Sequence, residues 1–203
     1  MELLLILIYP FTLGVGSRYD WFRLLAVMVF IAALYAALGR GRVTLVAFLL
    51  GTPAIVIHLA NVGGHLQTLA SASATLGVIF LAFVTVVFVW TVLSDPKVTG
   101  DTLAGAIAAY LLVGITYGLA YGLVATWSPG AFRNTIEPGR VIHPGDLIFF
   151  SFITLTTVGY GDIIPLDGQA RSLVILEFVT GIMYPAVLIG RLIGLHISRR
   201  VES

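Results

Sequence analysis

The sequence predicts an all-α membrane protein with six transmembrane helices and one short re-entrant helix between the fifth and the sixth. The 203 residues are 59% hydrophobic and only 10% charged, whereas an ordinary soluble domain carries about 25% charged residues. No Asp, Glu, Lys or Arg occurs between Arg42 and Asp95 or between Asp101 and Arg133. Each of these gaps exceeds the roughly 20 apolar residues that cross a bilayer as a helix.

Apolar runs separated by charged, Gly or Pro positions place the six helices. The expected spans are Leu3 to Gly16, Trp21 to Gly39, Val43 to Asn61, Leu66 to Leu93, Thr102 to Thr126 and Ser172 to Ile197. The first run is short, contains Pro10 and follows an acidic rather than a basic residue. We therefore interpret it as a retained membrane segment and not as a signal peptide, with its crossing of the membrane left open.

A different kind of segment lies between the fifth and sixth spans. The apolar run LIFFSFITLTT follows His143-Pro144-Gly145-Asp146, and about a dozen helical residues rise only about 18 Å. Pro144 suits a first helical position, and Asp146 in the first turn suits the positive end of the helix dipole. This segment is predicted to enter the membrane and return without crossing it.

The run Thr156-Thr157-Val158-Gly159-Tyr160-Gly161-Asp162 follows this half-helix. Non-helical backbone at membrane depth has to line a path for water or ions, because unsatisfied carbonyls are too costly in hydrocarbon. Glycines at alternate positions tolerate left-handed backbone angles, so successive carbonyl oxygens are able to point the same way. Four such strands around an axis would form stacked oxygen cages that replace the hydration shell of an ion.

This run is similar to the selectivity-filter signature of potassium channels, T-V-G-Y-G with a trailing Asp. The resemblance extends over about residues 99–203 and implies a homotetrameric potassium-channel pore made of outer helix, turret (Ser128 to His143), pore helix, filter and inner helix. It implies that K⁺ binds at Thr157, Val158, Gly159 and Tyr160. Gly161 completes the filter and Asp162 lies at its mouth. Residues 1–98 are then a peripheral region of four helices, and residues 99–203 are the pore domain.

The resemblance also assigns roles along the sixth span. Gly181 occupies the position at which small bacterial potassium channels typically have a hinge glycine, and Pro185 favours a kink at the same level. These two residues are the gating-hinge candidates, with packing of Gly181 against a neighbouring helix as the alternative. Ile182, Ile189 and Ile193 are the candidates that line the cavity.

Three positions depart from the family pattern. Many members have a glutamate and one or two tryptophans in the pore helix that hold the filter and its terminal aspartate, and the matching residues here are Ile153, Phe149 and Phe150. Asp162 therefore lacks those partners. We expect slow inactivation of the familiar kind to be absent.

Glu177 is the single acid deep in an apolar span, and such a group is a functional hypothesis by default. The first interpretation is that it holds the inner helix against the pore helix through the hydroxyl of Ser151 or Thr154. The alternative is a proton-sensitive gate.

The fourth span carries no Lys or Arg, so we expect no conventional voltage sensor. Basic residues are spread too evenly to decide orientation by the positive-inside rule. The pore resemblance implies an extracellular filter mouth and a cytoplasmic carboxyl terminus, in a multi-pass protein of the plasma membrane of a prokaryote.

The expected function is passive, potassium-selective conduction. The expected partners are K⁺, membrane lipid and three further copies of the chain. A net charge of +1 and the absence of cysteine argue against nucleic-acid binding and disulfides. No nucleophile and base pair or metal cluster suggests an enzyme or a cofactor. A weakly selective cation channel and a non-conducting channel-like scaffold are the alternatives.

Overall fold

The computed structural model describes residues 49, 51–53, 67–95 and 99–201. In chain order its elements are α4 (Gln67–Ser94), α5 (Gly100–Trp127), β1 (Phe132–Asn134), α6 (Pro144–Leu155), β2 (Ile163–Pro165) and α7 (Gly168–Val201). Three stretches within them are long and apolar enough to cross a membrane: Ala74–Ser94, Gly100–Trp127 and Gly168–Gly194. The three spans predicted before residue 62 fall outside the described residues, apart from residues 49 and 51–53, and stay predictions.

Polar caps set the starts of the long helices. The Thr99 hydroxyl accepts from the Thr102 amide at 3.2 Å, and the Thr102 hydroxyl accepts from the Thr99 amide at 3.4 Å. This reciprocal cap starts α5 at Gly100. Asp167 caps α7 in the same sense, because its carboxylate accepts from the Ala170 amide at 2.7 Å. The predicted starts at Thr102 and Ser172 were therefore too late, since the helices extend past the apolar runs to these caps.

The short helix α6 begins at Pro144, as its sequence predicts, and has 12 residues. The Asp146 carboxylate accepts from the His143 amide at 2.9 Å, which satisfies one of the free amides at the helix start. At about 1.5 Å per residue, α6 is too short to cross a bilayer.

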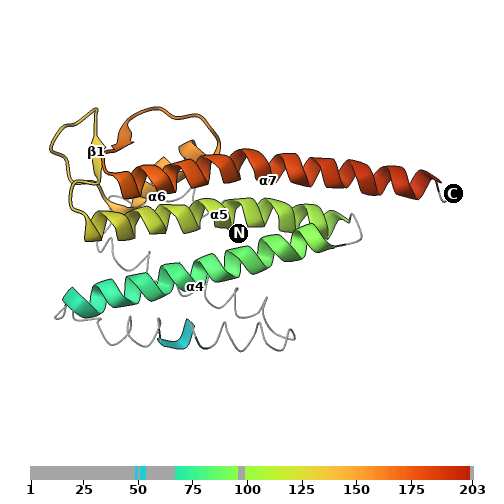
Figure 1. Cartoon of the computed structure of the whole chain (residues 1–203), viewed down its shortest axis with the longest axis horizontal. Helices are drawn as coiled ribbons and strands as arrows, with labels where there is room; N and C mark the ends of the chain where they lie inside the picture. Colours follow the sequence, from blue (N-terminus) through green and yellow to red (C-terminus); the bar gives the residue numbers. More distant parts are fainter. Residues whose placement is uncertain (1–48, 50, 54–66, 96–98, 202–203) are drawn as a thin grey trace, which may run out of the picture. The chain divides into compact units, whose positions relative to one another are not determined.

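Small residues bring α6 close to α5. A β-carbon on Gly114 would lie 2.7 Å from the ring of Phe152, and one on Gly118 would lie 2.8 Å from the main chain of Ile148. Glycines four residues apart form the kind of contact surface that lets helices approach closely in membranes. Figure 1 shows α5 and α7 side by side, with α6 packed at the end where α5 finishes and α7 begins.

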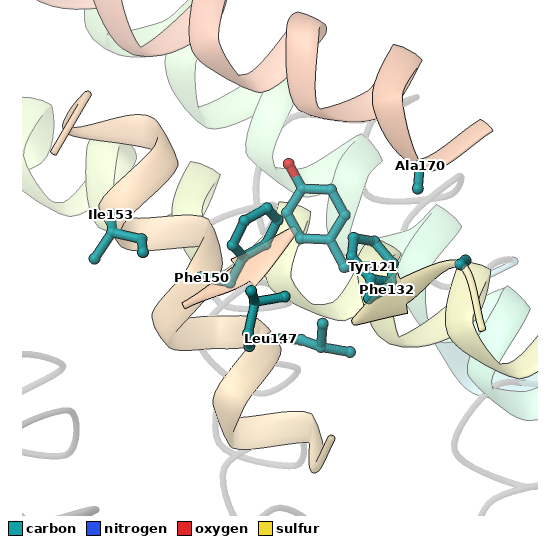
Figure 2. Close-up of a cluster of buried hydrophobic side chains, with 8 residues drawn as sticks. Tyr121, Phe132, Leu147, Phe150, Ile153 and Ala170 are labelled. Atoms are coloured by element: carbon teal, nitrogen blue, oxygen red, sulfur yellow. The ribbon is translucent and has the colours of Figure 1, made fainter. Parts of the chain in front are cut away.

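An aromatic cluster fills the space behind α6. The rings of Tyr121, Phe132 and Phe150 lie 5.2–5.8 Å apart between centroids, and Figure 2 shows them gathered between α5, β1 and α6. Phe150 and Ile153 both belong to this buried cluster. Two of the positions that depart from the channel pattern are thus core residues.

The compact unit that contains these elements begins at Thr85, inside α4. The expected functional boundary, between residues 98 and 99, falls in the linker after α4. That division into a peripheral region and a pore domain stays a prediction.

Candidate functional site

The segment that follows α6 has an alternating backbone. Thr157, Gly159 and Gly161 have φ angles of +62°, +56° and +74°, whereas Val158 and Tyr160 between them have negative φ. Alternation of positive and negative φ allows successive carbonyls to point to one side. Glycine adopts the left-handed region without a steric penalty, but Thr157 does so at a cost of about 1–3 kcal/mol.

The amides of this segment are directed back to α6. The N–H groups of residues 156–159 all donate to carbonyls of residues 152–154, at 2.8–3.1 Å. The carbonyl of Ile153 alone accepts from both Val158 and Gly159. By contrast, the carbonyls of residues 157–160 have no hydrogen-bond partner in the part of the chain that the structure describes. The donors of this segment are therefore bonded to α6, whereas its acceptors are left for partners outside the described residues.

The same segment lies on the surface of the single subunit. Residues 156–161 are all exposed, and the side chains of Val158 and Tyr160 are 53% and 71% exposed. Carbonyls that are unpaired within the described residues, at the level of helices apolar enough to cross a membrane, require polar partners from elsewhere.

A short sheet holds the outer end of this segment. Strands β1 and β2 pair antiparallel, with Arg133 opposite Ile164. Just beyond β1, the Thr135 hydroxyl donates to the Gly161 carbonyl at 2.6 Å, and the Thr135 amide donates to the Asp162 carbonyl at 2.8 Å. The turret is therefore bonded directly to the last residues of the predicted filter.

The side chains around the predicted filter mouth make apolar or local contacts. Phe149 stacks on Tyr160 with ring centroids 6.3 Å apart and an interplanar angle of 14°. The Asp162 carboxylate accepts from the adjacent amide of Ile163 at 3.0 Å. Phe149 thus supports Tyr160 by packing, and Thr135 supplies a polar contact to the backbone that sequence reasoning missed.

Glu177 lies at a junction of three helices. It is fully buried, as are Ser151 of α6 and Tyr121 of α5. Its carboxyl is hydrogen-bonded to the hydroxyls of Ser151 and Tyr121. Ser151 is one of the two partners expected from the sequence, whereas the Thr154 hydroxyl donates to Phe150 in its own helix. The contact to Tyr121 was not predicted.

Gly181 lies where α7 crosses the end of α6. A β-carbon built on Gly181 would lie 2.1 Å from the carbonyl oxygen of Leu155. Helix α7 continues without interruption through Gly181 and Pro185. The close approach to Leu155 supports the alternative that Gly181 is a packing contact between α7 and α6. The hinge role of Gly181 stays a prediction.

The residues predicted to line the cavity have exposed side chains on α7. Ile182, Ile189 and Ile193 are 44%, 56% and 56% exposed, and Pro185 is half-buried. Near the other end of α7, the Arg191 guanidinium donates to the carbonyls of Val92, at 2.9 Å, and Asp95. A cation at the carboxyl end of α4 is favourable because unpaired carbonyls and the helix dipole are negative there.

Neither Thr135 nor Tyr121 has a signal in the sequence that would have identified it. Thr135 is one polar residue in a polar turret, and Tyr121 is one of several tyrosines in an apolar helix.

Within the described ranges, no group of three or more His, Cys, Asp or Glu side chains is placed to hold a metal ion.

Comparison with known proteins associates this arrangement with ion channels. Residues 106–195 match a family model described as "Ion channel". Two-pore potassium channel 4 of Arabidopsis thaliana is 34% identical over 93 residues, which are 46% of this chain and 30% of the relative. Two pore potassium channel c of Oryza sativa subsp. japonica is 31% identical over 87 residues, 42% of this chain and 17% of the relative.

A bacterial relative is covered more completely. Protein LctB of Bacillus caldotenax is 28% identical over 107 residues, which are 50% of this chain and 79% of that protein. The chain spans less than a third of the length of the two plant relatives. No solved structure matches. Together these matches show that about half of the chain is similar to proteins described as ion channels and potassium channels, in the region that includes two of the three candidate membrane-spanning helices.

Proposed function

We propose that the chain is one subunit of a homotetrameric, potassium-selective channel that conducts K⁺ passively through a filter formed by residues 157–161. The observation that carries the proposal is the segregation of donors and acceptors after α6. All amides of residues 156–159 are bonded to α6, whereas the carbonyls of residues 157–160, which are exposed residues, have no hydrogen-bond partner among the described residues. One strand supplies too few oxygens to replace a hydration shell, and four strands around an axis supply stacked cages.

In this proposal the carbonyls of Thr157, Val158, Gly159 and Tyr160 bind K⁺. The Asp162 carboxylates form a ring at the mouth, and the carboxyl ends of four copies of α6 direct negative dipole ends toward the ion path. The exposed isoleucines of α7, Ile182, Ile189 and Ile193, would line the cavity below the filter.

Gating by a conventional voltage sensor does not belong to the proposal. Helix α4 contains no Lys or Arg along its 28 residues. A charge crossing the field contributes about 2.3 kcal/mol per 100 mV, so a helix without charge gains nothing from depolarisation. We further propose a plasma-membrane location with the filter mouth outside and the carboxyl terminus in the cytoplasm.

The test is to measure K⁺ flux and the reversal potential of the purified protein in liposomes. The full chain should assemble as a tetramer and carry a K⁺ flux that barium blocks, and the reversal potential should follow the K⁺ gradient. A reversal potential that does not shift when Na⁺ replaces K⁺ would indicate the weakly selective cation channel. An intact tetramer without flux would indicate the non-conducting scaffold.

The double substitution Gly159→Ala and Gly161→Ala provides the matched negative control for the filter. Both residues have positive φ and neither has a neighbour within 4 Å of an added β-carbon in the subunit. Alanine there opposes the required backbone angles rather than the packing of the subunit. The variant should lose K⁺ flux.

A further inference from the structure

The carboxyl of Glu177 is surrounded by groups from two other helices, all of them buried. Tyr121 of α5 donates to one carboxyl oxygen, and Ser151 of α6 is hydrogen-bonded to the other. The Ser151 oxygen also lies 2.6 Å from the carbonyl oxygen of Gly114 in α5. Glu177, Ser151 and Tyr121 are each 0% exposed, so water does not supply the missing partners in the subunit.

Counting protons in this cluster shows that one is missing if the carboxyl is ionised. The Ser151 hydroxyl has one proton but two neighbouring acceptors, the Glu177 carboxylate and the Gly114 carbonyl. Two oxygens 2.6 Å apart need a proton between them. If the hydroxyl proton points to Gly114, the Ser151 oxygen needs a donor from Glu177.

A neutral carboxylic acid satisfies every group. Tyr121 donates to one carboxyl oxygen, the protonated carboxyl oxygen donates to Ser151, and Ser151 donates to the carbonyl of Gly114. Buried polar groups are rarely left without partners, and an isolated carboxylate is strongly disfavoured in an apolar interior.

Among the residues that the structure describes, none supplies a compensating cation to Glu177. Among the described residues, the titratable groups that interact with Glu177 are the phenols of Tyr110 and Tyr121, and Tyr117 lies beside Tyr121; all three are on α5. The group that α6 presents to the carboxyl is the hydroxyl of Ser151, and no ion pair joins Glu177 to a Lys or Arg of the described segments.

We propose that Glu177 is held as a neutral carboxylic acid and is a positioning residue for the pore, donating a hydrogen bond that holds the inner helix α7 to α6 and, through Ser151, to α5. The positioning role rests on the proposed function, because α6 holds the filter only if the chain is a channel. The protonation state does not rest on it.

Infrared difference spectroscopy of the purified tetramer tests the protonation state directly. At neutral pH the wild-type protein should show the carbonyl stretching band of a protonated carboxylic acid, and Glu177→Gln should abolish that band. Glu137→Gln, which changes a turret acid whose side chain is 62% exposed, should leave the band unchanged. A wild-type spectrum without a protonated-acid band at neutral pH would overturn the proposal.

Substitutions test the positioning role. Glutamine reproduces one donor and one acceptor of the neutral acid, so Glu177→Gln should keep wild-type K⁺ flux and thermal stability. Ser151→Ala removes the link to Gly114 and should lower flux about tenfold or more. Ser172→Ala is the control, since that hydroxyl donates to Gly168 in its own helix. Equal flux in the Ser151 and Ser172 variants would contradict the positioning role.

The pH profile distinguishes a neutral donor from a merely space-filling residue. Raising the pH until the acid band disappears should remove wild-type flux, while Glu177→Gln keeps its flux over the same range. Parallel pH profiles of the two proteins would refute the positioning role. If the wild-type protein and every variant lack flux but the acid band is present in the wild type, the proposed channel function fails. The assignment of the proton to Glu177 then still stands.

Discussion

Replacing Gly181 by alanine separates two roles for this residue, a hinge in the inner helix and a packing contact with α6. The added β-carbon would lie 2.1 Å from the Leu155 oxygen and 2.9 Å from its carbonyl carbon. Optimal separations between heavy atoms are about 3.5–4.0 Å, so the two main chains have to move apart by more than about 1 Å.

The clash is with backbone rather than with a flexible side chain. The Leu155 carbonyl also accepts from the Tyr110 hydroxyl at 3.1 Å, so moving it disturbs the contact of α5 with α6 as well. Overpacking a close contact typically costs about 1–3 kcal/mol, and a rigid main-chain neighbour favours the upper part of that range. The gain of about 1 kcal/mol in helix propensity from Gly to Ala offsets only part of this cost.

Thermal unfolding of the purified tetramer in detergent measures this balance. Gly190→Ala is the matched control, because Gly190 lies in the same helix and an added β-carbon meets nothing within 4 Å in the subunit. Gly181→Ala should unfold at a lower temperature than the Gly190→Ala control and should lose assembled tetramer. If the two variants are equally stable and Gly181→Ala changes only the fraction of time the channel is open, the packing argument is refuted and the hinge assignment is supported.

Three other perturbations follow from the structure. Thr135→Val removes the hydroxyl that donates to the Gly161 carbonyl and should make the K⁺ current decay faster under constant stimulus. Thr135→Ser keeps the hydroxyl and should behave as wild type. An unchanged decay in Thr135→Val would contradict the inference that the turret supports the filter. Arg191→Gln should lower the free energy of unfolding by about 1.5–3 kcal/mol, the usual value of hydrogen bonds to a charged group. Arg191→Lys should restore part of this loss. An unchanged unfolding curve would contradict a stabilising role for the bonds from Arg191 to Val92 and Asp95. The Ala170 amide lowers the pKa of Asp167, so this cap stabilises α7 above the ordinary carboxyl pKa and loses its effect as the pH falls through the lowered value. Asp167→Asn should therefore flatten the acid limb of a stability profile, and an identical acid limb would refute the assignment.

The pattern of long apolar runs predicted the helices in the described region because each run is continuous and lacks charge. Pro144 and Asp146 similarly identified the start of α6, since both residue types have a physical preference for a helix start. The starts of α5 and α7 were less well predicted. Their caps, Thr99 and Asp167, lie outside the apolar runs that define the spans.

Apart from the contact of Glu177 with Ser151, the contacts between elements could not be predicted from the sequence. Strands β1 and β2 have three residues each, which is too few to recognise an alternation of apolar and polar residues in the sequence. The bond from Thr135 to Gly161 joins residues separated by the whole of α6, and the contact of Tyr121 with Glu177 joins two different spans. Such pairs become apparent only when the helices are packed.

The two hydrogen bonds to the Ile153 carbonyl tie the inner part of the predicted filter to α6. The oxygens that face outward belong to the main chain, so a change of side chain at Val158 alters the wall around them but not their number. A small displacement of α6 therefore shifts the inner part of this segment, whose amides are bonded to it, while Thr135 holds the outer end. The position of the inner carbonyls thus depends on how one short helix packs against α5 and α7, and residues far from the segment that set this packing affect those oxygens.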